Sequence, residues 1–243
     1  MAEKREGHGW WPYLGPYLGF GLISALGDRL PDSAALTMLF LKPLVVAALL
    51  IFFWRRGAYS ELRGFRWRSP WLLADVAVGV ALAAVWMGPY LLFPSIRPED
   101  VSGGFDPTRL GASLAPALVA LRMVAYAGVT PLFEELFMRS FVLRFAEVWD
   151  GKGDFRNVPI AHYTRNSFIA VIIIFTLTHL PWEYWVMVPW AILSTLWFYW
   201  RRHLVAVIVL HAATNGTILL AAALASGVFQ DGEGNPLPLW FFV

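Results

Sequence analysis

The sequence contains no cysteine among its 243 residues. A disulfide framework, a thiolate metal site and a cysteine nucleophile are therefore excluded. Charged residues are also scarce, at 15% of the chain against 58% hydrophobic residues. A soluble domain carries about 25% charged residues, so this chain has too few charges to cover a water-exposed surface. The composition predicts a membrane protein.

Excess positive charge is nearly absent as well, since the formal net charge is only +2. Lysine and arginine gather in short segments between apolar runs, which is typical of membrane topology signals. A nucleic-acid-binding domain would instead carry a broad basic face. We expect the lipid bilayer as a partner, and no nucleic acid.

Several hydrolase motifs are missing. The chain has no His-Glu-x-x-His zinc motif and no Gly-x-Ser-x-Gly elbow. No apolar span contains the Gly-x-Gly-Asp or Gly-x-Ser-Gly segments associated with aspartyl and rhomboid intramembrane proteases. No internal repeat and no separable soluble domain is visible, so we interpret residues 1–243 as a single transmembrane domain.

Long apolar runs are what the chain does contain, and about 20 helical residues cross a bilayer. We predict an all-α fold, a polytopic membrane bundle of seven or eight transmembrane helices around a polar cavity. Run 111–149 is too long for one crossing, and its Pro131 favours a kink or break. It is either one long tilted helix or a span followed by a second or re-entrant helix. The expected spans are 10–27, 34–54, 71–93, 111–149, 166–180, 186–200 and 204–228.

Basic clusters predict the orientation, because positive loops stay in the cytoplasm. One crossing through 111–149 gives seven spans, with the N-terminus inside and the C-terminus outside. Two crossings through 111–149 give eight spans. They would place the basic pair after the sixth run outside the cytoplasm, which conflicts with the same rule unless one segment is re-entrant. We expect a multi-pass protein of a bacterial-type plasma or inner membrane. The basic residues are Arg55, Arg56, Arg63, Arg66 and Arg68, against the single acid Glu61, and the pair Arg201-Arg202.

The first apolar run has two interpretations. Ala25 and Gly27 precede Asp28 in the manner of a signal-peptide cleavage site. Pro12 and Pro16, however, interrupt the apolar region that a signal peptide needs. We expect a retained first span.

Charges inside the run around Pro131 carry most of the functional information. A charge near the bilayer centre costs about 2.5–3.5 kcal/mol on insertion scales. Glu135 and Arg139 are four residues apart with the acid first, which favours a helical ion pair. Glu134 points elsewhere, because a helix turns by about 100° per residue, and it has no local cation. It needs a partner from another element or a proton, and such a carboxylate suits a general base.

Two more polar groups lie in other apolar runs. His179 ends one run, with Phe175 one helical turn before it. His211 and Asn215 share a helix face, and an imidazole beside a carboxamide can bind a metal, hold a water or donate to an oxyanion. Each group alone also has a structural interpretation, His179 as a helix-to-helix hydrogen-bond partner and Glu135–Arg139 as a packing pair. Their coincidence on three runs favours an active site.

The remaining polar residues have simpler interpretations. Asp75, near the start of its span, is expected at the membrane interface. Arg122 is expected to be the counter-charge of an acid. His8, His162 and His203 lie in polar or boundary segments and are expected to be solvated.

The three motifs together resemble a known family. Glu134-Glu135-x-x-x-Arg139, Phe175-x-x-x-His179 and His211-x-x-x-Asn215 are similar, in this order, to the motifs of the CPBP family, the CAAX prenyl endopeptidase and bacteriocin-processing (Abi) intramembrane proteases. The resemblance covers about 112–223, and 1–111 adds further N-terminal spans. It implies a helical membrane bundle with a cavity open to the membrane, and peptide-bond hydrolysis by an activated water.

The resemblance also implies roles for the residues. Glu134 with His179 would activate the water, and His211 with Asn215 would stabilise the oxyanion. Glu135 and Arg139 would support the site. The family is usually labelled metallopeptidase, and Glu134, His179 and His211 would fit zinc with an open position. The same residues would equally fit a metal-free mechanism of glutamate and water.

The implied substrate is a peptide or a membrane-associated, prenylated or otherwise processed protein. Two alternatives stay open. A non-catalytic immunity or scaffold member of the family would use the same polar cluster for packing. An ion-coupled transporter would also place ionisable groups inside its spans, and it would be expected to show repeated halves.

Overall fold

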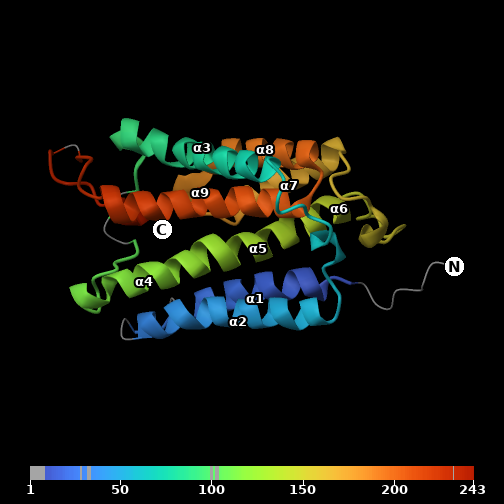
Figure 1. Cartoon of the computed structure of the whole chain (residues 1–243), viewed down its shortest axis with the longest axis horizontal. Coiled ribbons are helices and arrows are strands. Elements are labelled where there is room, and N and C mark those ends of the chain that lie inside the picture. Colours follow the sequence, from blue (N-terminus) through green and yellow to red (C-terminus); the bar gives the residue numbers. More distant parts are fainter. Residues whose placement is uncertain (1–8, 28, 32–33, 99–100, 102–103, 232) are drawn as a thin grey trace.

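The computed structural model describes residues 9–27, 29–31, 34–98, 101, 104–231 and 233–243. Their regular elements are all helical, apart from an isolated bridge between Gln230 and Pro236. This confirms the predicted all-α fold (Figure 1). The long helices are α1 (Trp11–Gly27), α2 (Ala35–Arg55), α3 (Trp71–Leu92), α7 (Arg165–Leu177), α8 (Tyr184–Arg201) and α9 (Leu204–Ala225), and the continuous helix Ala112–Phe145, which contains α4 (Ala115–Arg122), α5 (Thr130–Glu135) and α6 (Leu143–Phe145).

Within the described residues, four helices are long and apolar enough to cross a membrane: Thr37–Arg55, Trp71–Leu92, Ala112–Phe145 and Leu204–Ala225. The number of seven or eight crossings stays a prediction. The outside of the bundle exposes many large apolar side chains, a surface that soluble monomers rarely carry and that lipid tails solvate well. Examples are Leu18, Leu22, Leu44, Leu73, Leu196 and Leu224.

The helix Ala112–Phe145 does not break at Pro131, so the first of the two predicted alternatives is correct. Two π-helical stretches, Met123–Val129 and Leu136–Val142, flank α5. Proline removes one backbone donor and crowds the preceding turn. A π-helical turn is wider, and it lets the chain pass Pro131 without ending the helix.

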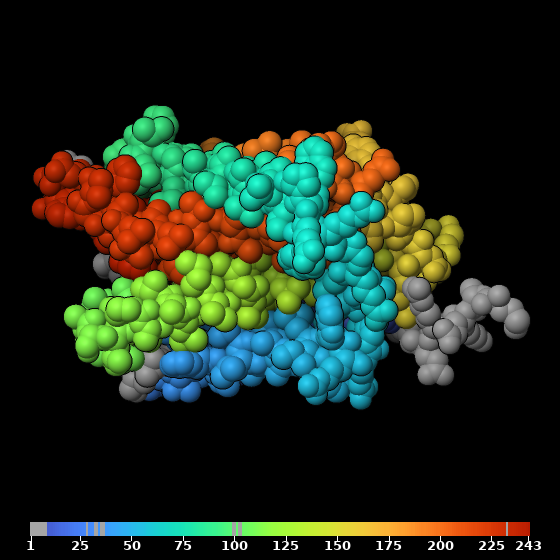
Figure 2. Space-filling model, in the orientation of Figure 1, coloured from blue at the N-terminus to red at the C-terminus, as the bar shows by residue number. Residues whose placement is uncertain are grey.

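The continuous helix separates two groups of helices. Figure 1 shows it running obliquely between the α1–α2 pair and the group formed by α3, α7, α8 and α9. Figure 2 shows the segment that follows α2 crossing one face of the molecule to reach α3. Aromatic side chains join α1 to the continuous helix: Tyr17 stacks on Phe137 with ring centroids 4.1 Å apart, and Phe20 lies 5.0 Å from Phe133. These contacts hold the glutamate-bearing helix from one side.

The only acid of the basic loop after α2 is part of a polar cluster at the end of the bundle. Glu61 accepts a hydrogen bond from the Tyr13 hydroxyl at 2.8 Å and another from Ser140. Its carboxylate also lies 3.6 Å from the Arg144 guanidinium. The cluster therefore ties α1 and this loop to the continuous helix.

Helices α3 and α9 approach closely at Gly79. A Cβ atom at this position would lie 2.3 Å from the Leu210 carbonyl oxygen. The Thr214 hydroxyl donates to the Gly79 carbonyl at 2.9 Å. Because His211 follows Leu210 on α9, this contact sets the depth at which His211 enters the bundle.

We expect Gly79→Ala to lower the free energy of unfolding by about 1–3 kcal/mol, the usual cost of overpacking. The added methyl group would meet backbone atoms, which cannot rotate away. Gly21→Ala is the matched control, because a Cβ at Gly21 meets no atom within 4 Å and alanine favours a helix. Denaturant unfolding in detergent measures both variants. Equal stability of the two would contradict the close α3–α9 contact.

Asp75 is buried inside the bundle and paired, while its expected depth at the membrane interface stays a prediction. Its side chain is fully buried and forms an ion pair with Arg201, with Nε donating at 2.7 Å and Nη2 at 3.0 Å. The Trp197 indole donates to the same carboxylate at 2.9 Å. Asp75 is buried because it lies one turn inside α3, on the side that faces α8.

The acid partner expected for Arg122 is not found, since no carboxylate of the described residues pairs with it. The guanidinium instead lies over the rings of Phe105 and Tyr126, with its carbon 5.5 Å and 5.3 Å from their centroids. Cation–π contacts of this kind replace an ion pair in part.

The histidines outside the motifs differ among themselves. His8 lies outside the described residues. His162 is 51% exposed and contacts Glu147 at 2.7 Å, in agreement with a solvated position. His203 accepts a hydrogen bond from the Val205 amide at 3.2 Å and caps α9. Burial lowers the pKa of His203, so the ring caps the helix in its neutral form.

Candidate active site

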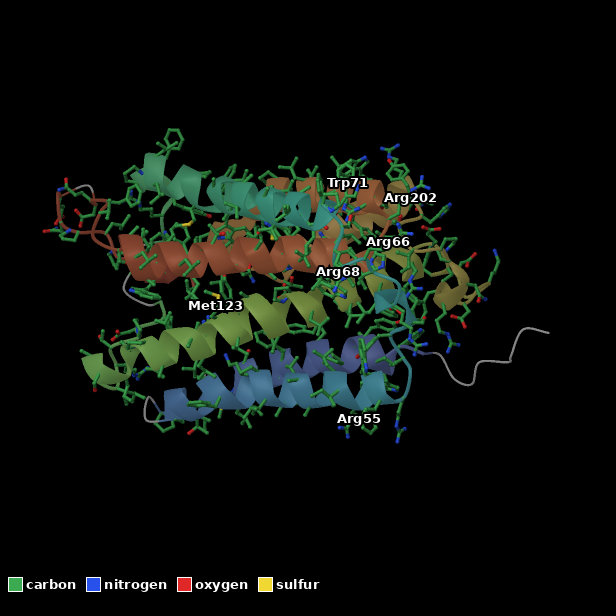
Figure 3. All side chains as sticks on the ribbon, in the orientation of Figure 1. Arg55, Arg66, Arg68, Trp71, Met123 and Arg202 are labelled. Atoms are coloured by element: carbon green, nitrogen blue, oxygen red, sulfur yellow. The ribbon has the colours of Figure 1, made fainter. Side chains whose placement is uncertain are left out.

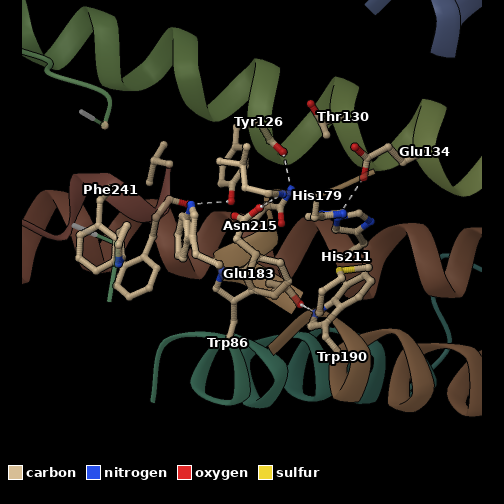
Figure 4. Close-up of a pocket in the computed structure, with 18 residues that line it drawn as sticks. Trp86, Tyr126, Thr130, Glu134, His179, Glu183, Trp190, His211, Asn215 and Phe241 are labelled. Atoms are coloured by element: carbon tan, nitrogen blue, oxygen red, sulfur yellow. Dashed lines mark hydrogen bonds and ion pairs between the residues drawn. The ribbon is translucent and has the colours of Figure 1, made fainter. Parts of the chain in front are cut away.

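The four residues predicted to be catalytic line one cavity of about 360 Å³. Glu134 comes from α5, His179 from the turn after α7, and His211 and Asn215 from α9. Figure 4 shows Glu134 pointing from the continuous helix toward His211. The structure thus brings the three sequence motifs together.

His211 lies between the two adjacent glutamates. Its Nδ1 is 2.8 Å from Glu135 Oε1, and its Nε2 is 3.7 Å from Glu134 Oε2. An ionised carboxylate only accepts hydrogen bonds, so Nδ1 carries the proton shared with Glu135. Glu135 therefore orients the ring, and Nε2 faces Glu134 and the cavity.

The predicted ion pair of Glu135 and Arg139 is confirmed. Arg139 Nε lies 3.3 Å from Glu135 Oε2, and neither side chain is exposed. Arg139 Nη2 also donates to Ser194 at 2.8 Å and Thr195 at 3.2 Å, both on α8. These bonds to a second helix fix the carboxylate that holds His211.

His179 presents a free ring nitrogen. Its Nδ1 lies 2.9 Å from the Phe175 carbonyl oxygen. A carbonyl can only accept, so Nδ1 carries the proton and Nε2 is left as an acceptor. The ring packs edge-on against Trp86, with centroids 5.7 Å apart. His179 can therefore accept a hydrogen bond from a water in the cavity.

Asn215 is held by a backbone carbonyl that the irregular helix leaves available. Its Nδ2 donates to the Tyr126 carbonyl at 2.8 Å. In the π-helical stretch the Thr130 amide donates to Ala125, five residues back. The corresponding donor for Tyr126 would be residue 131, a proline without an N–H. Asn215 satisfies this carbonyl with one N–H, and its second N–H is available to a ligand.

Aromatic rings form much of the cavity wall. Trp190 lies with its ring centroid 4.7 Å from that of His211, and Phe175 lies 6.1 Å away. Apolar walls lower the local dielectric constant and strengthen the hydrogen bonds inside. Several lining residues were not predicted from the sequence: Trp86, Tyr126, Thr130, Trp182, Glu183 and Trp190. Tyr126 and Thr130 precede Glu134 at four-residue intervals, and this spacing could have revealed them.

The expected zinc site stays a prediction. Glu134, His179 and His211 line the same cavity, but the part of the chain that the structure describes holds no group of three His, Cys, Asp or Glu side chains able to bind a metal ion. Nδ1 of His211 is held by the Glu135 carboxylate and Nδ1 of His179 by the Phe175 carbonyl, an arrangement that leaves Nε2 of each ring for a water or a metal ion. We derive no chemical step through a metal.

Residues 116–217 match the model of the family described as "Type II CAAX prenyl endopeptidase Rce1-like". The match confirms the family resemblance. All three motifs of the CAAX endopeptidase family lie inside the matched segment, and at the family level it implies intramembrane endopeptidase activity of the CAAX type. Neither the curated proteins nor the solved structures gave a match to the chain.

Proposed function

We propose that the chain is an intramembrane endopeptidase that hydrolyses a peptide bond of a membrane-associated or prenylated protein. The observation that carries this proposal is the convergence of Glu134, His179, His211 and Asn215 on one cavity, within the CAAX endopeptidase segment. Three separate segments of the chain supply a base, a hydrogen-bond acceptor and donors to a common space.

Glu134 and His179 activate a water molecule in the proposed reaction. The water donates one hydrogen bond to the Glu134 carboxylate and the other to His179 Nε2. Its oxygen forms a bond to the scissile carbonyl carbon while Glu134 takes the proton. General base catalysis of this kind contributes about 10²–10⁴-fold.

Asn215 and His211 stabilise the oxyanion that forms. The second N–H of Asn215 donates to it, and a protonated His211 Nε2 donates as well, with its charge balanced by Glu135. The C–N bond then breaks, and Glu134 returns its proton to the departing amine. The products are a peptide with a new carboxyl group and a peptide with a new amino group.

We expect Asn215→Ala to lower kcat by about 10²–10³-fold, the usual cost of losing one oxyanion donor. The assay uses detergent-solubilised full-chain protein and a quenched-fluorescence farnesylated peptide that ends in Cys-aliphatic-aliphatic-X. Thr217→Ala is the control, because the Thr217 hydroxyl bonds to the Ala213 carbonyl of its own helix, at 2.7 Å. Equal rates for the two variants would remove Asn215 from the mechanism.

We further propose a multi-pass orientation in a bacterial-type plasma or inner membrane, with the N-terminal side of α1 in the cytoplasm. Arg55, Arg66, Arg68 and Arg202 lie at one end of the bundle (Figure 3), and positive loops stay in the cytoplasm. The absence of native cysteine allows a direct test. Arg68→Cys should resist a membrane-impermeant maleimide in intact cells, and Thr108→Cys should react; the reverse pattern would invert the orientation.

A further inference from the structure

The active-site cavity is lined by a further carboxylate that the proposed mechanism does not use. Glu183 ends the short helix η8 (Pro181–Glu183), which connects α7 to α8, and it lines the same cavity as Glu134 and His211. In Figure 4 it lies between Phe241 at one end of the cavity and His211 at the other. The described wall of the cavity therefore contains two acids, which come from different elements of the bundle.

The structural role of Glu183 does not need a charge. Its Oε2 accepts a hydrogen bond from the Leu180 amide at 2.8 Å and so caps η8. A glutamine at this position would make the same bond. No lysine, arginine or histidine of the described residues pairs with the carboxylate, and none of their groups donates to its Oε1. One oxygen is thus left for a group that enters the cavity.

A carboxylate at this depth is costly without a cation. Asn215 lines the same cavity and lies in the middle of α9, a helix long and apolar enough to cross a membrane. Acids inside a membrane bundle are rare, are usually paired, and mark a functional site by default. Because the described part of the chain supplies no partner to Glu183, we expect the counter-charge to come from a ligand.

The surrounding wall favours an organic cation. Aromatic side chains line the cavity together with Glu183, among them Trp86, Tyr126, Trp182 and Trp190. Aromatic faces attract ammonium and guanidinium groups, most strongly where water is excluded. A carboxylate forms short, charge-assisted hydrogen bonds with the same groups, and apolar rings pack well against the alkyl chain of a lysine or arginine. Tryptophan rings, in contrast, offer no lone pair to a metal ion.

Contacts with α3 hold the turn that carries Glu183. The Tyr90 hydroxyl donates to the Trp182 carbonyl at 2.6 Å, and the two rings pack edge-on with centroids 5.3 Å apart. Glu183 is the next residue, and its own bond to the Leu180 amide fixes the side chain. A carboxylate fixed in this way loses little conformational freedom on binding, which favours affinity.

We propose that Glu183 selects the substrate by binding a lysine or arginine side chain close to the scissile peptide bond. Oε2 keeps its bond to the Leu180 amide, Oε1 accepts from the ammonium or guanidinium, and the aromatic wall packs against the alkyl chain. This proposal rests on the proposed endopeptidase function and names its substrate class more closely, as proteins with a basic residue near the cleaved bond.

The test compares pairs of farnesylated peptides that end in Cys-aliphatic-aliphatic-X and differ at one position, with lysine in one peptide and methionine in the other. Methionine has a similar length and no charge. The lysine is placed in turn at each position on either side of the cysteine. Binding to full-chain Glu134→Gln protein, which lacks the proposed base, is measured by fluorescence anisotropy in detergent. At the position that reaches Glu183, we expect lysine to bind about 10- to 100-fold more tightly than methionine.

Two further substitutions assign this preference to one carboxylate. Adding Glu183→Gln should lower the ratio of the two affinities to about one, because glutamine keeps the bond to the Leu180 amide but carries no charge. Glu183→Asp should keep part of the preference. Glu147→Gln is the matched control, because Glu147 contacts His162 away from the cavity, and it should leave the ratio unchanged.

Equal binding within every peptide pair, absence of binding by all peptides, or a lysine preference that survives Glu183→Gln in folded protein would overturn the proposal. Zinc binding that depends on Glu183, without any lysine preference, would assign the carboxylate to a metal ion and overturn it too. Failure of the proposed function looks different. A lysine preference that depends on Glu183, without cleavage of any peptide by the unmodified chain, would keep the cation site and remove the endopeptidase.

Discussion

Glu134→Gln is expected to reduce peptide cleavage by at least about 10³-fold, within the range of general base catalysis. Glutamine has nearly the same shape as glutamate but cannot take a proton from water. The carboxylate forms no ion pair with Arg139, which binds Glu135 instead, so its loss should leave the bundle intact. Rates with the farnesylated peptide and thermal unfolding in detergent measure the two properties separately.

Glu147→Gln is the matched control for this change, because Glu147 contacts His162 in a segment away from the cavity. It should cleave at the normal rate. If Glu134→Gln cleaved as fast as this control, Glu134 would not be the base. If both variants and the unmodified chain were inactive but a biological function persisted, the polar cluster would serve packing, as in a scaffold member of the family.

The second large effect is expected on stability. Glu135→Ala leaves the Arg139 guanidinium buried without its carboxylate, and breaking a buried pair in this way costs about 3–5 kcal/mol. It also releases His211 Nδ1 from its partner at 2.8 Å. Denaturant unfolding in detergent should therefore show a large loss of stability, together with a loss of cleavage.

The double variant Glu135→Ala, Arg139→Leu separates the two consequences. Removing both charges eliminates the unpaired cation, so much of the stability should return. Cleavage should stay low, because His211 still lacks the carboxylate that orients it. A single Glu135→Ala variant as stable as the unmodified chain would show that the buried pair does not hold the helices together.

Local spacing predicted part of this site correctly. The pair Glu135–Arg139 follows from the i, i+4 geometry of a helix and is present at 3.3 Å. The three motifs could be assigned to separate apolar runs, because charges in such runs are too costly to be incidental. For the long run around Pro131 the sequence allowed either one long helix or a span followed by a second or re-entrant helix. The structure has the continuous helix.

Contacts between distant segments could not be predicted in the same way. The hydrogen bond between His211 and Glu135 joins residues 76 positions apart, and the ion pair of Asp75 and Arg201 joins residues 126 positions apart. These contacts depend on how the helices pack. The position of Asp75 near a helix start therefore gave no indication of its buried partner Arg201.

The π-helical turn before Pro131 could not be predicted from the sequence either. Its consequence is a free Tyr126 carbonyl, which positions Asn215. Helix propensity does not distinguish an α-turn from a π-turn, because both have similar side-chain requirements. The role of Asn215 could be expected from the family motif, but the group that holds it could not.

Metal analysis of the purified, cleavage-competent full-chain protein shows whether Glu134 and His179 activate water without a metal ion, as the proposed mechanism assigns. We expect far less than one zinc ion per chain by mass spectrometry of the metal content, with cleavage of the farnesylated peptide that survives chelation. About one zinc per chain, lost in both His179→Ala and His211→Ala together with activity, would contradict this expectation. Water activation would then belong to a metal ion held by Glu134, His179 and His211, which line one cavity.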